Sequence, residues 1–189
     1  LHDEVGANLS SIAIYVALLR QKIPQNIALL PILDKITENS EESVTLMRDT
    51  VWAINPNNVS VDQLISRCRS VGKELLSAKG IRFSFVVDES FQRLSLHMEL
   101  RRNIYLLYKE ALHNIVKHSQ ATDSLVRFQA KGNSWSVMIH DNGVGFDPAL
   151  VYEGNGLRNF VLRGQEADLR VQVTSQEGQG TTILIEGTA

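Results

Sequence analysis

Four polar side chains stand close together near the middle of the sequence: Glu110, Asn114, Lys117 and His118. Spacings of four, three and one residues place them on one face of a helix predicted over residues 95–118. The side-chain oxygens of Glu110 and Asn114 are ligands that suit Mg²⁺, and Lys117 offers a positive charge to a phosphate. A solvated polar edge, ending in a Lys–His pair favoured by the helix dipole, is the alternative explanation.

An acidic residue ends a predicted strand further along the chain. Apolar residues alternate from Trp135 to Ile139, so the same alternation turns Asp141 towards the apolar face of the strand. A carboxylate buried there without a partner is costly, and an adenine amino group would be a suitable donor. Gly143 and Gly145 follow at once. Asp-Asn-Gly is also typical of a tight hairpin turn, but a simple hairpin does not explain Gly145.

Two later segments could contact an anion or a base. Gly154 and Gly156, followed by Leu157, lead into a helix predicted over residues 157–167, and a helix N-terminus favours phosphate. A flexible loop before an ordinary helix has the same pattern. Thr181 could bond through its hydroxyl to a ligand or to the buried acid, or could simply favour the last strand. The sequence contains no Gly-x-x-x-x-Gly-Lys-Ser/Thr motif, which excludes a P-loop NTPase.

The first 55 residues have the apolar pattern of two helices joined by a short connection. On the first, about residues 3–23, a heptad seam contains Val5, Leu9, Ile12, Val16, Leu19 and Ile23. The second seam contains Ile32, Ile36, Val44, Met47, Val51 and Ile54, with Ser40 at one seam position. A single antiparallel hairpin cannot bury both its faces. We therefore expect residues 1–55 to pair with a second copy as a four-helix bundle, the alternative being packing against the chain's own second domain.

Residues 56–60 are a predicted linker and residues 61–189 a predicted second domain. Ser60 and Gln63 form a capping-box pattern before a helix of about residues 61–79. Strands are predicted in residues 81–87, 124–130, 135–141, 169–175 and 181–186. Together with the helices, the order is α-β-α-β-β-α-β-β. We therefore predict an α+β chain, in which the helical hairpin precedes a two-layer α/β sandwich with a mixed sheet.

Composition excludes several classes of protein. The 189 residues carry a formal net charge of −2, so nucleic acid is not an expected partner. A single cysteine, Cys68, excludes a disulfide framework and a thiolate metal site. No apolar run approaches the roughly 18 residues that span a bilayer, and no signal peptide is visible. The chain begins with Leu1 rather than Met, so we expect it to be a piece of a longer protein.

The polar motifs, taken in order, resemble the ATPase superfamily shared by histidine kinases, type II topoisomerases and a heat-shock chaperone, over about residues 60–189. They are Glu110-x-x-x-Asn114-x-x-Lys117-His118, Asp141-x-Gly143-x-Gly145, Gly154-x-Gly156-Leu157 and Gly180-Thr181. The resemblance implies that ATP and Mg²⁺ bind here, with Asn114 as a metal ligand and Glu110 nearby. It also implies that Asp141 binds the adenine amino group, that Thr181 helps to hold the adenine, and that the glycines form the floor and lid of the pocket. Lys117, His118 and Leu157 complete the implied nucleotide site.

The start of the chain resembles the phosphoacceptor of the sensor-kinase subclass with a His-Asp motif and a short ATP lid. A neutral imidazole is a good nucleophile near neutral pH, so His2 is the expected acceptor. The resemblance assigns Asp3 as its proton acceptor, with Glu4 as the rival. Some members carry a glutamine five residues after the histidine for phosphatase activity. Here that position is Ala7, so such activity would fall to Asn8.

The expected function is that of a dimeric, cytoplasmic sensor histidine kinase core, anchored to a membrane only through regions outside this fragment. His2 would take the γ-phosphoryl group of ATP and pass it to an aspartate of a response regulator receiver domain. An ATP-binding signalling scaffold without kinase activity and a serine kinase of the same superfamily remain alternatives. A topoisomerase-like ATPase is disfavoured by the lack of a basic surface.

Overall fold

The chain is described from a computed structural model, which describes residues 12, 14–16, 18–19, 31–37, 40, 43–44, 60–147 and 155–189, with the backbone alone at 155–159. It divides into two compact units, Leu1–Asn55 and Pro56–Ala189. Each unit is described by itself. None of the helices in the described part of the chain combines the length and the apolar character needed to cross a bilayer.

The first unit is helical wherever it is described, at residues between 12 and 19 and between 31 and 44. Of the predicted seam residues, Val16 is buried. Others remain substantially exposed in the single chain, namely Ile12 at 42%, Leu19 at 50%, Ile32 at 55% and Ile36 at 39%. Isoleucine and leucine side chains with this exposure leave an apolar surface on the first unit. His2, Asp3, Ala7 and Asn8 lie outside the described residues.

The second unit confirms the predicted α+β fold. Its elements, in chain order, are α3 (Val61–Ser77), β1 (Arg82–Val87), α4 (Glu89–Gln92), α5 (Met98–Asn114), the π-helical turn η1 (Ile115–Ser119), β2 (Asp123–Lys131), β3 (Ser134–Asp141), α6 (Asn155–Glu166), β4 (Arg170–Gln176) and β5 (Gly180–Thr188). The short helix α4 was not predicted. Its four residues are too few for a periodic pattern.

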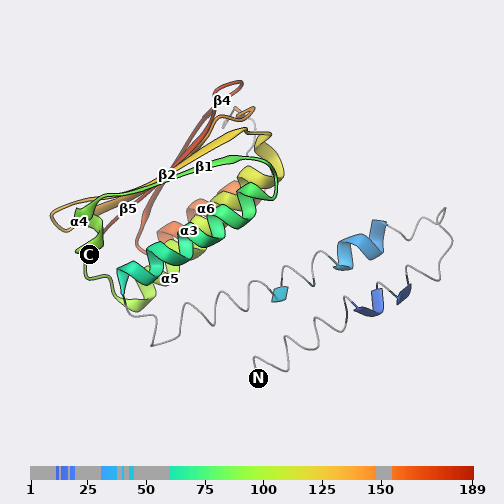
Figure 1. The fold of residues 1–189 in the computed structure, drawn as a ribbon, viewed down its shortest axis with the longest axis horizontal. Coiled ribbons are helices and arrows are strands. Elements are labelled where there is room, and N and C mark those ends of the chain that lie inside the picture. Colours follow the sequence, from blue (N-terminus) through green and yellow to red (C-terminus); the bar gives the residue numbers. More distant parts are fainter. Residues whose placement is uncertain are drawn as a thin grey trace. The chain divides into compact units, whose positions relative to one another are not determined.

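The sheet is mixed, with the strand order β1-β2-β3-β5-β4. Strands β1 and β2 run parallel, and the other three neighbouring pairs run antiparallel. Helices α3, α5 and α6 cover one face of this sheet, so the unit has two layers (Figure 1). Because the helices lie on one face only, side chains that alternate along each strand face either this helical layer or the opposite side.

Local sequence signals explain how α3 is placed in the helical layer. The capping box is confirmed, because the Ser60 hydroxyl accepts from the Gln63 backbone N–H at 3.2 Å and the Gln63 side chain accepts from the Ser60 N–H at 3.2 Å. Gly72 lets α3 approach its neighbours closely. A Cβ atom there would lie less than 3.0 Å from the hydroxyl oxygen of Tyr108 on α5 and from the ring of Phe83 on β1.

The prediction of one helix over residues 95–118 was wrong at its C-terminal end. The α-helical pattern stops at Asn114, and residues 115–119 form the wider π-helical turn. The Ser119 hydroxyl donates to the Ile115 carbonyl at 2.8 Å, and Gln120 ends the turn with a left-handed φ of 54°. π-Helical turns are rare and occur frequently at functional sites.

Candidate functional site

Asp141 is the buried acid that the alternation predicted. It ends β3 on the helical side of the sheet, and only 3% of its surface is exposed. Its Oδ1 accepts from the Gly143 backbone N–H at 2.9 Å. Burial raises the pKa of this carboxyl, while the backbone N–H of Gly143, the charge of His140 and the backbone N–H of Thr181 oppose that rise. A ligand that donates a further hydrogen bond would stabilise the charged form of such a carboxylate.

The loop after Asp141 packs tightly against the π-helical turn. The Val144 backbone N–H donates to the Ser119 carbonyl at 2.7 Å. A Cβ atom at Gly143 would lie less than 3.0 Å from that same carbonyl oxygen and from Oδ1 of Asp141. No side chain fits between these atoms, so glycine is required for the loop to reach its position beside the acid.

A second close approach joins this loop to the turn between β4 and β5. Gly145 and Gly180 have positive φ angles of 59° and 79°. Their Cβ positions lie less than 3.0 Å from backbone oxygens, those of Gln176 and Asp141 respectively. The Gly178 N–H also donates to the Val144 carbonyl at 2.7 Å. The glycines of the predicted motifs therefore bring two loops together around the end of β3.

Sequence reasoning missed the role of Asn142. Its side-chain oxygen accepts from the backbone N–H groups of Thr122 and Asp123 at 3.0 and 2.9 Å. Its amide nitrogen donates to the Thr122 hydroxyl at 3.0 Å and to Asp123 at 3.2 Å. Asp123 in turn accepts two hydrogen bonds from Arg82, at 2.6 and 2.8 Å. The available signal was that asparagine in a turn often binds nearby backbone groups.

The polar residues of the predicted helix fall on two different kinds of turn. Glu110 and Asn114 lie on α5, and Lys117 and His118 on the π-helical turn, where both are exposed. The spacing of an α-helix therefore places Glu110 and Asn114 on one face, but it does not apply to Lys117 and His118. Glu110 is 3.8 Å from Arg163 of α6. Among the described residues, no three His, Cys, Asp or Glu side chains gather in a way that could hold a metal ion.

Thr181 lies opposite Asp141 in the sheet register. Its hydroxyl lies 2.9 Å from the Ser175 hydroxyl rather than bonding to Asp141. Its backbone N–H is one of the three groups, after the Gly143 N–H and the charge of His140, that oppose the rise in the pKa of Asp141. Ser175 was not predicted. Its oxygen accepts from the Phe146 N–H at 3.0 Å, and its hydroxyl lies 3.0 Å from the Gly180 carbonyl. No local pattern distinguishes this serine from any other residue of an alternating strand.

The structure describes only part of the predicted motif Gly154-x-Gly156-Leu157. Helix α6 begins at Asn155, two residues before the predicted start, so Gly156 and Leu157 lie in its first turn. Gly154 lies outside the described residues. Helix α6 contacts both α5 and β4, so its first turn belongs to the same layer as Asn114.

The fold and the order of the glycine turns define a class: a helical segment followed by an α/β-sandwich ATPase domain. A family described as histidine kinase-, DNA gyrase B- and HSP90-like ATPase matches residues 99–186, and a family described as histidine kinase matches residues 1–58. The chain belongs to the sensor histidine kinases of this ATPase superfamily. Its ATPase domain implies ATP binding.

Similar proteins support this assignment along almost the whole chain. Sensor histidine kinase ComP of Bacillus subtilis is 28% identical over 98% of this chain and 25% of its own length. Oxygen sensor histidine kinase NreB of Staphylococcus carnosus is 25% identical over 98% of this chain and 53% of its own. The chain thus spans a quarter to about half of these relatives. The solved structure of Acinetobacter baumannii histidine kinase AdeS shares the fold, with a TM-score of 0.60 at 13% identity over 95% of this chain and 94% of that one.

Proposed function

We propose that ATP binds at the end of β3, with the Asp141 carboxylate accepting a hydrogen bond from the adenine amino group. The observation that carries this proposal is the burial of Asp141, which has 3% of its surface exposed at the meeting point of two glycine turns. Gly143 and Gly145 form the floor, and Thr181 supports the acid from β5. The Gly154 segment would be the lid over the nucleotide.

Mg²⁺ and the phosphates belong beside α5. The amide oxygen of Asn114, with Glu110 one turn earlier, offers hard oxygen ligands to Mg²⁺, which keeps several waters and usually takes few protein ligands. Glu110 is within 3.8 Å of Arg163, so it would act as a neighbour of the metal rather than as its main ligand. Lys117, His118 and the first turn of α6, with Gly156 and Leu157, would carry the phosphate charge.

The reaction we propose is transfer of the γ-phosphoryl group to His2. A ring nitrogen of the neutral imidazole forms a bond to phosphorus, the bond from phosphorus to the bridging oxygen breaks, and ADP leaves. Asp3 takes the proton from the other ring nitrogen, with Glu4 as the rival base. The phosphoryl group then passes to an aspartate carboxylate of a response regulator. The chain would work as a homodimer formed by the hairpin.

Nucleotide binding is tested with Asp141→Asn, which keeps the shape of the side chain and removes its charge. We expect ATP affinity to fall at least about a hundredfold, because an amide can present its N–H groups to the adenine donor and leaves a buried polar group unsatisfied. Titration calorimetry measures the affinity, and circular dichroism checks the fold. The control is Asp168→Asn at an exposed turn with φ 58°, a conformation asparagine tolerates. Full ATP affinity in Asp141→Asn would refute the proposed adenine site.

Phosphoryl transfer is tested by incubating the chain with γ-labelled ATP. We expect acid-labile, base-stable label on the wild-type protein and none on His2→Gln, whose ATP affinity should be unchanged. Acid-stable label would indicate a serine kinase of the same superfamily. ATP binding without any label would indicate a signalling scaffold.

A further inference from the structure

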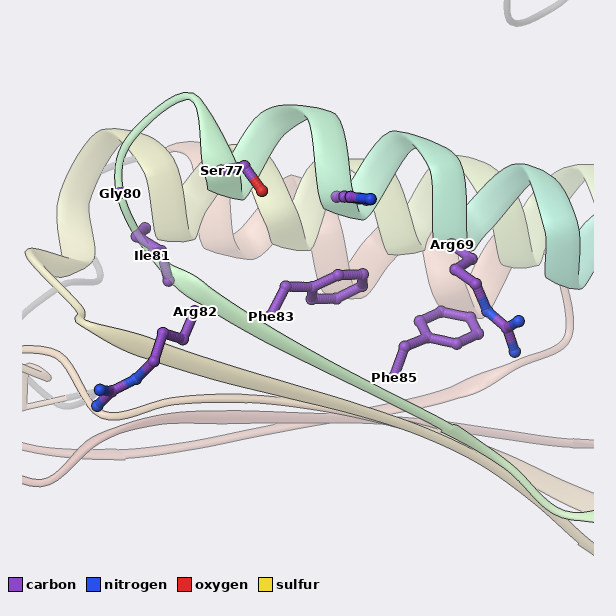
Figure 2. A pocket seen from close by; sticks show the side chains of 8 residues that line it. Arg69, Ser77, Gly80, Ile81, Arg82, Phe83 and Phe85 are labelled. Carbon is purple, nitrogen blue, oxygen red and sulfur yellow. The ribbon is translucent and has the colours of Figure 1, made fainter.

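A second candidate binding surface lies at the outer edge of the sheet, between α3 and β1. An open groove of about 720 Å³ is lined there by Arg69, Lys73, Ser77, Gly80, Ile81, Arg82, Phe83 and Phe85. Phe83 and Phe85 rise from β1 towards α3, and Arg69 descends from α3 beside the ring of Phe85 (Figure 2). The nucleotide site does not use this groove, since two strands of the sheet separate β1 from β5 and one separates it from β3.

Strand β1 has an open edge beside this groove. In the part of the chain that the structure describes, β1 pairs with β2 and with no other strand. The Arg82 backbone N–H donates to the carbonyl of Thr122, just before β2, and the Asp88 N–H donates to the carbonyl of Phe128 on β2, each at 2.9 Å. In a parallel ladder, the backbone N–H and C=O groups of successive residues point alternately to the two edges of the strand. Those of Arg82 point towards β2, so those of Phe83 and Phe85 point away from β2, towards the open edge. An open edge of this kind can pair with an added strand.

The charge around the groove is positive. The guanidinium of Arg69 lies over the ring of Phe85, with 5.1 Å between them, and Lys73 is one helical turn further along α3. Arg82 also lines the groove, but its charge is balanced by Asp123 at 2.6 Å. Among the described residues that line the groove, none is acidic. The charges of Arg69 and Lys73, together with the two rings, therefore favour a ligand with both carboxylate and apolar side chains.

We propose that an extended peptide segment adds to the sheet as a strand beside β1, and that this segment carries both acidic and apolar residues on one of its faces, at every second position. Its backbone would pair with the outward groups of Phe83 and Phe85. Side chains from one face would enter the groove, where apolar groups meet the two rings and carboxylates meet Arg69 and Lys73. Strand addition of this kind draws affinity from backbone hydrogen bonds and specificity from the alternate side chains. The proposal is independent of the proposed kinase function.

The probe is a fluorescein-labelled octapeptide, Glu-Ser-Val-Ser-Glu-Ser-Val-Ser, which places glutamate and valine on the same face of an extended strand and serine on the other. It is titrated with the 189-residue chain and followed by fluorescence polarisation. We expect saturable binding that weakens as salt increases, because the charges lie near the surface. Two control peptides separate the two parts of the idea. The same peptide with lysine in place of both glutamates refutes recognition of acidic side chains if it binds as tightly. The same peptide N-methylated at every residue refutes strand pairing if it binds as tightly.

A matched pair of variants locates the binding site. We expect Lys73→Glu to weaken binding about fivefold, because it replaces an attraction by a repulsion at the rim of the groove. Lys79→Glu makes the same charge change just beyond α3, at an exposed residue that does not line the groove, and should change affinity less than about twofold. Thermal unfolding confirms that both variants fold. Equal weakening in the two variants, unchanged affinity in Lys73→Glu, or no binding by wild type would overturn the proposal.

Discussion

At the scale of single residues, the site depends on glycines for two different physical reasons. Gly143 has no positive φ, and it is required because a Cβ atom would meet the Ser119 carbonyl oxygen. Gly178 has a φ of 74° and nothing within 4 Å of a Cβ position, so its requirement is purely conformational. The first kind of glycine sets where a loop lies, whereas the second only permits a turn.

These two glycines provide a matched prediction. Gly143→Ala should lower the free energy of unfolding by about 2 to 3 kcal/mol, through crowding against backbone atoms, and should also reduce ATP affinity because the loop shifts away from Asp141. Gly178→Ala should cost about 1 kcal/mol and leave ATP affinity unchanged. Urea denaturation and calorimetry measure the two quantities. Equal effects of both variants on ATP affinity would contradict the steric explanation.

At the scale of elements, three segments are tied together by one polar chain. Arg82 at the start of β1 bonds to Asp123 at the start of β2, and Asp123 bonds to Asn142 in the loop after β3. Hydrogen bonding from Arg82 is the main reason that the pKa of Asp123 falls from 3.8 to about 2, with the Thr122 hydroxyl contributing next. The ionised carboxylate thus helps to hold the loop that follows Asp141.

The lowered pKa predicts a dependence of stability on pH. Because the pKa is lower in the folded chain, ionised Asp123 contributes stability at pH values above about 4, and this contribution is lost as the pH falls towards 2. We therefore expect the difference in unfolding free energy between wild type and Asp123→Asn to be constant from pH 7 to 5 and to shrink below pH 4. Urea denaturation across this range measures it. A difference that stays constant down to pH 2.5 would show that the ion pair has no such role.

At the scale of the whole molecule, the apolar surface of the first unit bears on whether two copies of the chain associate. Leu19 is 50% exposed and Ile32 is 55% exposed, although both belong to predicted seams. Burying such a surface against a second copy removes apolar area from water and satisfies the heptad pattern. The proposed homodimer is therefore the simplest explanation of side chains that one chain leaves uncovered.

Leu19→Glu should weaken the dimer, because it would place a charge in an apolar seam. We expect an increase of at least about tenfold in the dimer dissociation constant, measured by analytical ultracentrifugation. Ile14→Glu is the control, since Ile14 is 59% exposed and lies on the opposite side of the same helix from the seam. Dissociation by Ile14→Glu but not by Leu19→Glu would place the interface on the other face.

Much of the second unit was predictable, because its signals are local. Alternation along β3 correctly turned Asp141 inwards, and the pattern at Ser60 and Gln63 correctly started α3. The spacing of apolar residues indicates on which side of its own helix or strand a residue lies. The same reasoning failed after Asn114, because the π-helical turn is closed by Ser119, an ordinary residue whose hydroxyl binds a carbonyl four residues earlier.

By itself, then, the sequence determined the order of the five strands and the three long helices of the second unit, the inward direction of Asp141 and the family to which the chain belongs. Only the tertiary structure decided that Asn142 joins β2 to the loop after β3, and that Thr181 turns its hydroxyl to Ser175. It also decided that an open groove borders β1. The physical reason is that these contacts join residues on different strands or elements. A pattern within one strand does not specify which strand lies beside it, and hydrogen-bond partners are set by that neighbour.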